Sequence, residues 1–192
     1  MNPKYAHDRY LVRKQILALV GAKIDIFDDN GEPVLFSQMK AFKLKEDIRL
    51  FSDDTMREEL IRIQARSVID FSATYDVVDS VTGENLGSLR RKGMKSIVKD
   101  EWVIMDASER EVGLIKEDSA FKAFLRRFLT NLIPQKFHVD IGGKPVALFR
   151  QDLNPFVGKL TLDFTADRDR LLDRRLGLAA AILLVAIEGQ QG

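Results

Sequence analysis

The feature that most limits how this chain can fold is an apolar run near its C-terminus. Twelve consecutive residues, from Leu176 to Ile187, have no charged or polar side chain. A helix of that length is about 18 Å long, whereas the hydrocarbon core of a bilayer is about 30 Å thick. Apolar runs of about 10–14 residues are more typical of a protein core than of a membrane span. We therefore predict a buried helix, with a membrane tail anchor as the alternative.

A helix that is apolar on every face must be surrounded by protein on every side. Three consecutive alanines, Ala179 to Ala181, keep this helix thin. A β-sheet that closes into a barrel would enclose it, and closure also removes exposed sheet edges. The buried helix therefore predicts that the rest of the chain consists mainly of β-strands.

A repeated pair of strands runs through the first two thirds of the chain. Similar stretches begin at Val34, Leu60, Leu86 and Val112, and each begins 26 residues after the previous one. Strict spacing of this kind marks a structural unit that is used repeatedly. The unit has two strands, because a propeller blade requires four strands in about 40–50 residues.

Turn-forming residues separate the strands of each pair. The segment from Asp28 to Gly31 contains two Asp residues, Asn and Gly, and similar turns open at Asp79 and Asp106. Asn and Gly tolerate positive φ angles, and Asp side chains accept hydrogen bonds from the backbone ahead. These turns and the β-branched or aromatic runs between them predict twelve antiparallel strands. The predicted ranges are 10–17, 23–28, 33–41, 47–52, 59–66, 73–79, 85–92, 100–106, 111–116, 136–141, 145–151 and 157–164.

One predicted helix, at residues 119–132, interrupts the strands. Apolar side chains recur there at helical spacing, and Pro134 lies beyond its end. The basic residues Lys122, Arg126 and Arg127 lie off the apolar stripe, so this helix is a candidate membrane-surface element. The favoured alternative is that its apolar stripe packs against one end of the barrel.

The composition excludes several classes of function. The chain of 192 residues contains no cysteine, so it has neither disulfides nor thiolate metal sites. Its formal net charge of +1 gives no overall attraction to nucleic acid or membrane, so any such attraction must be local. The N-terminus has no apolar signal segment, and no linker divides the chain. We expect one cytoplasmic domain over residues 1–192, with its core at 10–188.

The chain contains no recognisable catalytic motif. It has no G-x-S-x-G, P-loop, G-x-G-x-x-G or H-E-x-x-H pattern. Its two histidines, His7 and His138, lie far apart in the sequence. We therefore predict that the protein is not an enzyme and has no cofactor.

A calcium site is also not predicted in the turn at Asp28. Aligning Gly31 with the EF-hand glycine places Ile26 and Ser37 at the first and last ligand positions, where the motif requires carboxylates. The segment is therefore interpreted as a hairpin turn.

A second group of acidic residues lies just before the apolar run. It consists of Asp163, Asp167 and Asp169, with Arg168 and Arg170 between them. The arginines weaken any cation site, so we interpret Asp167 as the N-cap of the C-terminal helix. No metal site is predicted.

A basic cluster within ten residues is the strongest functional lead. Its members are Arg90, Arg91, Lys92, Lys95 and Lys99, with no acidic residue among them. If these side chains converge, they form a candidate site for the phosphate groups of lipids or other anions. The alternative is a solvated strand edge, where lysines discourage aggregation.

Together, these segments resemble a known family. The hairpins IDIFDDNGEPV and TYDVVDSVTGENLGSL, the basic amphipathic helix and the ending FTADRDRLLDRRLGLAAAILLVAIE are similar to the LURP-one-related family. That family belongs to the tubby C-terminal-like superfamily, which includes the phospholipid scramblases. The resemblance covers residues 10–188 and implies a twelve-stranded barrel threaded by a hydrophobic C-terminal helix. Tubby domains bind phosphoinositides and scramblases are linked to calcium-dependent lipid movement, so it also implies lipid binding.

The predicted fold class is mainly β (α+β), a closed antiparallel barrel around a buried helix. The predicted function is a non-enzymatic module that contacts anionic phospholipid or phosphoinositide headgroups, peripherally at a membrane. The alternative is a protein-interaction or scaffolding domain with an unidentified protein partner. A carrier of small apolar molecules is disfavoured, because the helix would fill the bore. No nucleic-acid partner is expected, and a closed barrel without pairing edges favours a monomer.

Overall fold

The computed structural model describes residues 2–17, 21–40, 47–66, 73–92, 101–118, 135–152 and 157–187. These residues form twelve strands, one short 3₁₀ turn and one α-helix. The elements are η1 (Pro3–Tyr5), β1 (Arg9–Leu17), β2 (Gly21–Phe27), β3 (Pro33–Lys40), β4 (Asp47–Phe51), β5 (Glu59–Ala65), β6 (Thr74–Asp79), β7 (Asn85–Arg91), β8 (Glu101–Met105), β9 (Glu111–Glu117), β10 (Gln135–Ile141), β11 (Lys144–Asp152), β12 (Val157–Asp163) and α2 (Arg174–Ile187).

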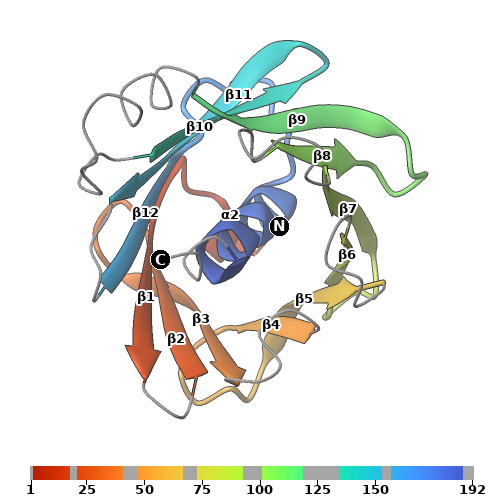
Figure 1. Cartoon of the computed structure of the whole chain (residues 1–192). Coiled ribbons are helices and arrows are strands. Elements are labelled where there is room, and N and C mark those ends of the chain that lie inside the picture. The colour runs from red at the N-terminus through yellow and green to blue at the C-terminus, as the bar shows by residue number, and fades with distance from the viewer. Residues whose placement is uncertain are drawn as a thin grey trace.

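The strands form one closed antiparallel barrel in which each strand pairs with its neighbours in the sequence. Pairing of β1 with β12 closes the barrel, in a register that runs from Arg9 opposite Asp163 to Gln15 opposite Val157. Figure 1 shows the strands as a ring around α2. The predicted fold class is confirmed, and all twelve predicted strands are present with bounds within two residues of the prediction.

The repeated hairpins take their shape from the aspartate that opens each turn. The Oδ1 atom of Asp28 accepts the backbone N–H groups of Asn30 and Glu32 at 2.9 and 2.8 Å. Asp106 accepts those of Ser108 and Arg110 at 2.9 and 3.0 Å. The sequence repeat is therefore a repeated Asp-based turn between paired strands, as predicted.

The helix α2 lies in the bore, as the apolar run predicted. Leu178, Ala179 and Leu183 are completely buried. Gly177 makes a close approach: a Cβ atom at this position would lie 2.8 Å from the ring of Phe164. The buried-helix prediction is confirmed and the tail anchor is wrong. Among the described residues, no helix combines the length and the apolar character that crossing a bilayer requires.

Antiparallel neighbours place the connections alternately at two ends of the barrel. One end, called the turn end below, also carries η1 and the start of α2. Its residues are 2–9, 28–33, 52–59, 79–85, 106–111, 141–144 and 163–175. The opposite end, called the far end, is where β1 joins β2, β3 joins β4, β5 joins β6, β7 joins β8, β9 joins β10 and β11 joins β12. The last turn of α2 lies toward the far end, because Val185 contacts Lys14 near the end of β1.

Candidate functional site

The predicted basic cluster begins at the end of β7, on the far end of the barrel. Side chains on a strand alternate between its two faces, so Arg91 is on the side of the buried Leu89, whereas Arg90 and Lys92 are on the outer side. Arg90 forms an ion pair with Glu111, and Lys92 Nζ lies 3.4 Å from a carboxylate oxygen of Glu101. The structure therefore does not bring these three residues onto one face.

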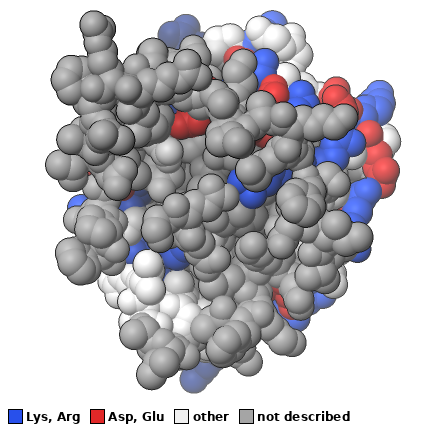
Figure 2. All heavy atoms as spheres, in the orientation of Figure 1, with Lys and Arg blue, Asp and Glu red and all other residues white. Residues whose placement is uncertain are grey.

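Charges of both signs lie side by side on the visible outer surface of this part of the barrel (Figure 2). In Figure 2, Lys and Arg side chains alternate with Asp and Glu side chains on the side where Figure 1 shows β7, β8 and β9. Alternating charges of this kind cancel over short distances, and salt screens what remains. The outer wall near β7 is therefore only a weak anion-binding surface.

The other predicted site residues lie outside the described residues. Lys95 and Lys99 belong to the connection between β7 and β8, and Lys122, Arg126 and Arg127 to the connection between β9 and β10, within the predicted helix 119–132. Both connections begin and end at the far end of the barrel. The topology places the described strand ends that flank both connections at one end of the barrel, and a role of these basic residues in binding stays a prediction.

The turn end differs in charge from the rest of the chain. The residues of the turn end include 17 Asp and Glu residues against nine Lys and Arg residues. The rest of the chain has the reverse balance, with 12 acidic and 21 basic residues. A net charge of +1 therefore conceals an acidic end on an otherwise basic molecule.

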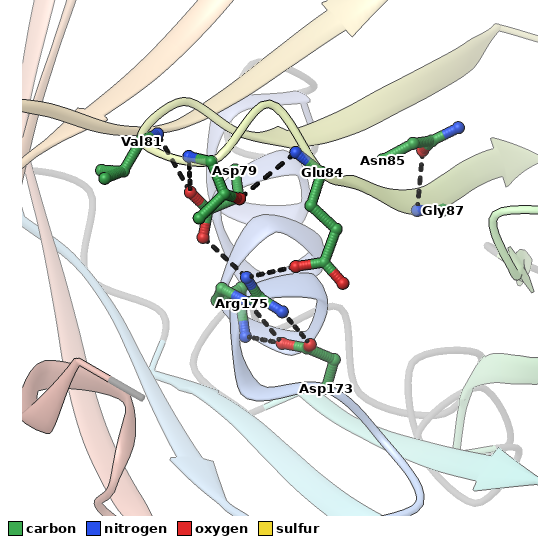
Figure 3. Close-up of polar contacts among 8 residues, drawn as sticks. Asp79, Val81, Glu84, Asn85, Gly87, Asp173 and Arg175 are labelled. Atoms are coloured by element: carbon green, nitrogen blue, oxygen red, sulfur yellow. Dashed lines mark hydrogen bonds and ion pairs between the residues drawn. The ribbon is translucent and has the colours of Figure 1, made fainter.

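Five of the acidic residues at the turn end contact the first turn of α2. Figure 3 shows Arg175 in contact with three carboxylates from two parts of the chain. Its guanidinium lies 2.6 Å from Asp79, 3.0 Å from Glu84 and 2.7 Å from Asp173. The hydrogen bonds that Arg175 donates to these carboxylates, led by the one to Asp173, raise the pKa of Arg175. The contacts connect the first turn of α2 to the β6–β7 hairpin.

Asp79 serves the hairpin and the helix at the same time. Burial disfavours its charged form, but hydrogen bonds from the backbone of Thr82 and Val81 and from Arg175 outweigh this effect. The pKa of Asp79 therefore lies below its ordinary value. Its carboxylate remains charged in the folded protein and is a structural anchor for α2.

Arg174 and Asp167 form a fully buried ion pair beside this network. Arg174 Nη1 lies 2.8 Å from Asp167 Oδ2, and the two side chains are 1% and 0% exposed. Asp8 is a second, more exposed partner at 3.2 Å, and the Phe164 ring lies 4.5 Å from the guanidinium carbon. Charge and aromatic contact together compensate for burial of the guanidinium.

The predicted N-cap of α2 is wrong. Asp167 accepts the backbone N–H groups of Leu171 and Leu172, which precede the helix. The capping residue is Asp173, whose Oδ1 accepts the N–H of Arg175 at 2.8 Å. Asp167 is therefore a buried partner for Arg174 and not a cap.

The acidic group that precedes the apolar run, Asp163, Asp167 and Asp169, makes contacts within the protein. Asp163 Oδ1 accepts the backbone N–H and the hydroxyl of Thr165, and its other oxygen pairs with Arg9. The carboxylate of Asp169 lies 4.0 Å from Lys144. These contacts, together with the Asp167 pair, explain the group as part of the turn end.

Within the described residues, one group has ligand atoms close enough for a common metal ion. It consists of His7, Asp28 and Asp29, whose ligand atoms lie within 4.8 Å of one another. Asp28 is already bonded within its turn, and His7 Nδ1 lies 3.2 Å from Asp29 Oδ1. Protein contacts account for the group, and the prediction of no metal site stays a prediction.

Two residues of interest at the far end were missed in the sequence. Lys14 is buried in the bore, and its Nζ donates a hydrogen bond to the Val185 carbonyl at 2.9 Å. Burial lowers the pKa of Lys14. Ile16, two residues further along β1, is 59% exposed. Both lie on the side of β1 that faces the bore, together with the apolar residues Tyr10 and Val12. A lysine at position 14 interrupts this alternating apolar series, and that interruption could have identified it from the sequence.

The fold defines a class of protein: an antiparallel barrel of sequential strands threaded by a C-terminal helix. A model of the LURP-one-related family matches residues 34–185, and the chain belongs to this family. Among solved structures, a protein from Arabidopsis thaliana matches with a TM-score of 0.55 at 11% sequence identity. The match covers 97% of this chain and 96% of that one, and at this identity it supports the fold alone. No curated protein matches significantly.

Proposed function

We propose that this protein is a non-enzymatic module that binds anionic phospholipid surfaces with the far end of its barrel. The observation that supports this proposal is the separation of charge between the turn end and the rest of the chain. An anionic surface repels the acidic turn end and attracts the more basic remainder of the chain, so the far end faces the surface. The protein therefore approaches such a surface in one orientation.

The site in this proposal is the far end and not the outer wall of β7. Arg90 and Lys92 have acidic partners there, so they contribute little to the attraction. Lys95 and Lys99 lie between β7 and β8 in the sequence, and Lys122, Arg126 and Arg127 lie between β9 and β10; the described strand ends that flank both segments are at the far end. Basic residues near an anionic leaflet contribute about 1 kcal/mol each, so a few of them are sufficient for peripheral binding.

Family membership is compatible with a non-enzymatic module. The resemblance to tubby-like proteins, some of which bind phosphoinositides, supports a lipid as the ligand. The cytoplasmic leaflet is the anionic one in cells, so this function places the protein on the cytoplasmic side.

Cosedimentation with vesicles tests the proposal. The full chain is mixed with vesicles of phosphatidylcholine, or of phosphatidylcholine and phosphatidylserine in equal amounts, at low and high salt. We expect binding to the anionic vesicles alone and its loss at high salt. Absence of binding to anionic vesicles at low salt would overturn the proposal and favour a protein partner.

A pair of charge-reversal variants tests whether binding depends on which end carries the basic residues or only on the net charge of the protein. The first variant combines Lys95→Glu, Lys99→Glu and Lys122→Glu, basic residues that the sequence assigns to the connections between β7 and β8 and between β9 and β10. The control combines Arg57→Glu, Lys144→Glu and Arg168→Glu, three exposed residues of the turn end. Both change the net charge by the same amount. We expect loss of binding only in the first, whereas equal loss in both would show that no particular end faces the lipid.

A further inference from the structure

Five basic residues form a diagonal stripe on the outer wall of the barrel, from β10 to β2. They are Lys136 on β10, Arg150 on β11, Lys159 on β12, Arg13 on β1 and Lys23 on β2. These five strands are consecutive in the closed sheet, and Figure 1 shows them side by side. Lys23, Lys136 and Arg150 are exposed, and the other two are partly exposed. We call these five residues the basic stripe.

Strand register places the members of the basic stripe on the outer face. Lys136 is directly opposite Arg150, and Lys159 is directly opposite Arg13. Side chains alternate between the two faces of a strand, and a neighbour of each stripe residue along its strand is buried in the barrel. These buried neighbours are Phe137, Phe149, Leu160, Val12 and Ile24.

The other two steps of the basic stripe are diagonal. Thr161 is opposite Arg150 and lies two residues from Lys159 on β12. Arg13 and Lys23 are related in the same way across β1 and β2. Opposite side chains have Cβ atoms about 5 Å apart and diagonal ones about 7–8 Å apart, so successive members of the basic stripe are neighbours throughout.

The basic stripe is electrostatically unfavourable for the isolated barrel. Like charges that lie directly opposite each other destabilise a sheet, and the stripe contains two such pairs. Asp25 lies opposite Arg13, and Asp152 lies opposite Lys159. Within the described residues, however, no member of the basic stripe forms an ion pair. The repulsion is therefore not relieved by close acidic partners.

Basic residues on the opposite wall of the barrel are paired instead. Six of them, on or next to β4, β5, β7 and β9, form ion pairs with Asp or Glu side chains. They are Arg49, Arg62, Arg66, Arg90, Lys92 and Lys116. On β1 itself, Arg9 is paired with Asp163 near the turn end. Unpaired charge is therefore a property of the basic stripe and not of basic residues in this barrel generally.

Arg13 shows most clearly that the basic stripe has unused binding capacity. Its guanidinium carbon lies 5.9 Å from the centre of the Phe27 ring, which supports the side chain without neutralising its charge. Its Nε is buried and has no hydrogen-bond partner. Buried donors of this kind are uncommon in folded proteins, and they call for a ligand or another explanation.

The shape of the wall favours a flexible partner over a flat one. The basic stripe crosses four of the twelve strand-to-strand steps, about a third of the barrel circumference. A flat bilayer touches only part of such a curve, whereas an extended chain can follow it. If the far end lies on lipid, this wall also remains free.

The spacing of the basic stripe matches an extended peptide. Successive members are about 5–8 Å apart, and alternate side chains of an extended peptide are about 6.7 Å apart. Single-stranded nucleic acid requires aromatic side chains on which bases stack. On the outer face of these five strands, as far as the structure describes them, Phe27 is the one Phe, Tyr or Trp side chain, and Arg13 lies over its ring.

We propose that the basic stripe binds an extended segment of a partner protein that carries Asp or Glu at alternate positions. The partner's carboxylates offset the repulsion between the stripe residues and accept hydrogen bonds from them. This inference goes beyond the proposed function, because it concerns a protein partner on the wall and not lipid at the far end. Exposed ion pairs are weak individually, so several act together and the affinity falls with added salt.

A peptide-binding experiment with the full chain tests the inference. The probe is a fluorescein-labelled peptide of alternating Glu and Thr, and fluorescence anisotropy at low salt measures its binding. The stripe variant combines Arg150→Gln and Lys159→Gln. The control combines Arg62→Gln and Lys116→Gln, exposed residues of the opposite wall, and loses the same charge. We expect about tenfold weaker binding in the stripe variant and less than about twofold weaker binding in the control.

Thermal unfolding distinguishes a role in binding from a role in folding. Each substitution in the stripe variant removes one of two like charges that lie directly opposite each other. We therefore expect the variant to unfold at or above the wild-type temperature. A clearly lower unfolding temperature would show that these side chains stabilise the barrel, and would overturn the inference.

The remaining outcomes separate this inference from its alternatives. Equal peptide binding by the stripe variant and the wild type, or equal weakening in both variants, would overturn it. Tighter binding of an oligothymidylate of the same charge would overturn it in favour of nucleic acid. Cosedimentation with anionic vesicles should be unchanged by saturating peptide, whereas displacement would overturn the assignment of a separate protein site. Absence of vesicle binding alone would overturn the proposed function and leave the basic stripe intact.

Discussion

The first turn of α2 has two arginines with five carboxylates around them. Near its last turn, one lysine among the described residues contacts the helix. The first group comprises Arg174 with Asp8 and Asp167, and Arg175 with Asp79, Glu84 and Asp173. At the other end, Lys14 donates one hydrogen bond to the Val185 carbonyl. Among the described residues, the same helix therefore contacts many charged side chains at the turn end and one at the far end.

The helix dipole explains why the two ends need different numbers of charges. The N-terminus of a helix carries partial positive charge, so arginines in the first turn are unfavourable unless carboxylates compensate them. The C-terminus carries partial negative charge and has carbonyl groups without helical partners, so a lysine there is favourable by itself. At the turn end the carboxylates therefore offset an unfavourable placement of two arginines, whereas Lys14, the charged contact among the described residues at the far end, is favourable by itself.

The largest effect should come from Asp167→Asn, which removes one charge of the buried pair. Arg174, 1% exposed, would keep only the more exposed Asp8 as a charged partner. Loss of one partner of a buried ion pair costs about 3–5 kcal/mol in unfolding free energy. Equilibrium urea unfolding of the variant and the wild type measures this loss.

A double variant separates pairing from packing at this site. Replacement of both partners, Asp167→Asn with Arg174→Met, removes the unpaired buried charge and should restore much of the stability lost in the single variant. If the double variant were as unstable as the sum of the two single ones, the pair would not be coupled. The first turn of α2 would then be held by packing and not by this ion pair.

Arg175 allows a finer test, because its partners differ in exposure. Asp79 is 9% exposed and Glu84 is 56% exposed. We expect Asp79→Asn to cost about 1–3 kcal/mol, since a hydrogen bond to a charged group is lost in a mostly buried place. Glu84→Gln should cost less than about 1 kcal/mol, as exposed pairs do. Equal costs in urea unfolding would show that exposure does not govern this network.

The sequence was sufficient to predict the strands, the barrel and the buried helix, because these depend on local patterns. Apolar runs, turn residues and helix length are all read along the chain. The contacts at the ends depend on which segments meet across the barrel. The N-cap was misassigned because Asp167 and Asp173 both precede the helix, and only the backbone shows which one meets its first N–H groups.

The candidate site was predicted less well for the same reason. Arg90 and Lys92 look like free basic residues in the sequence, because Glu111 and Glu101 lie on other strands. Their pairing follows from strand register, which the sequence pattern did not specify. Ile16 was counted as an ordinary strand residue, since the level at which α2 ends in the bore is a tertiary property.

Acid should remove the contribution that Asp79 makes to stability at the turn end. The pKa of Asp79 is below its ordinary value of 3.8, so its contribution to stability is present above that value. The contribution is lost as pH falls through the lower, folded-state pKa. The stability difference between wild type and Asp79→Asn should therefore shrink below pH 3.8, as urea midpoints at neutral and acid pH would show. A difference that stays constant would mean that the charge of Asp79 has no role.

The smallest effect should come from Lys14→Met at the far end. The variant loses the hydrogen bond to Val185 but also loses a buried cation, so its unfolding free energy should change by less than about 1 kcal/mol. A loss as large as that of Asp167→Asn would show that the two ends of α2 are held alike.

The pH dependence of the stability that Lys14 contributes provides a sharper measurement. Burial lowers the pKa of Lys14 from 10.5, so the unfolded chain binds more protons than the folded one between the two pKa values. Stability due to Lys14 therefore rises with pH through that window. Wild type should gain stability relative to Lys14→Met between neutral pH and pH 10.5. Burial raises the pKa of Tyr10 to about 12, and this alkaline effect is shared by both proteins, so it cancels in the difference. A difference that is constant or falls with pH would show that Lys14 keeps its ordinary pKa in the folded barrel.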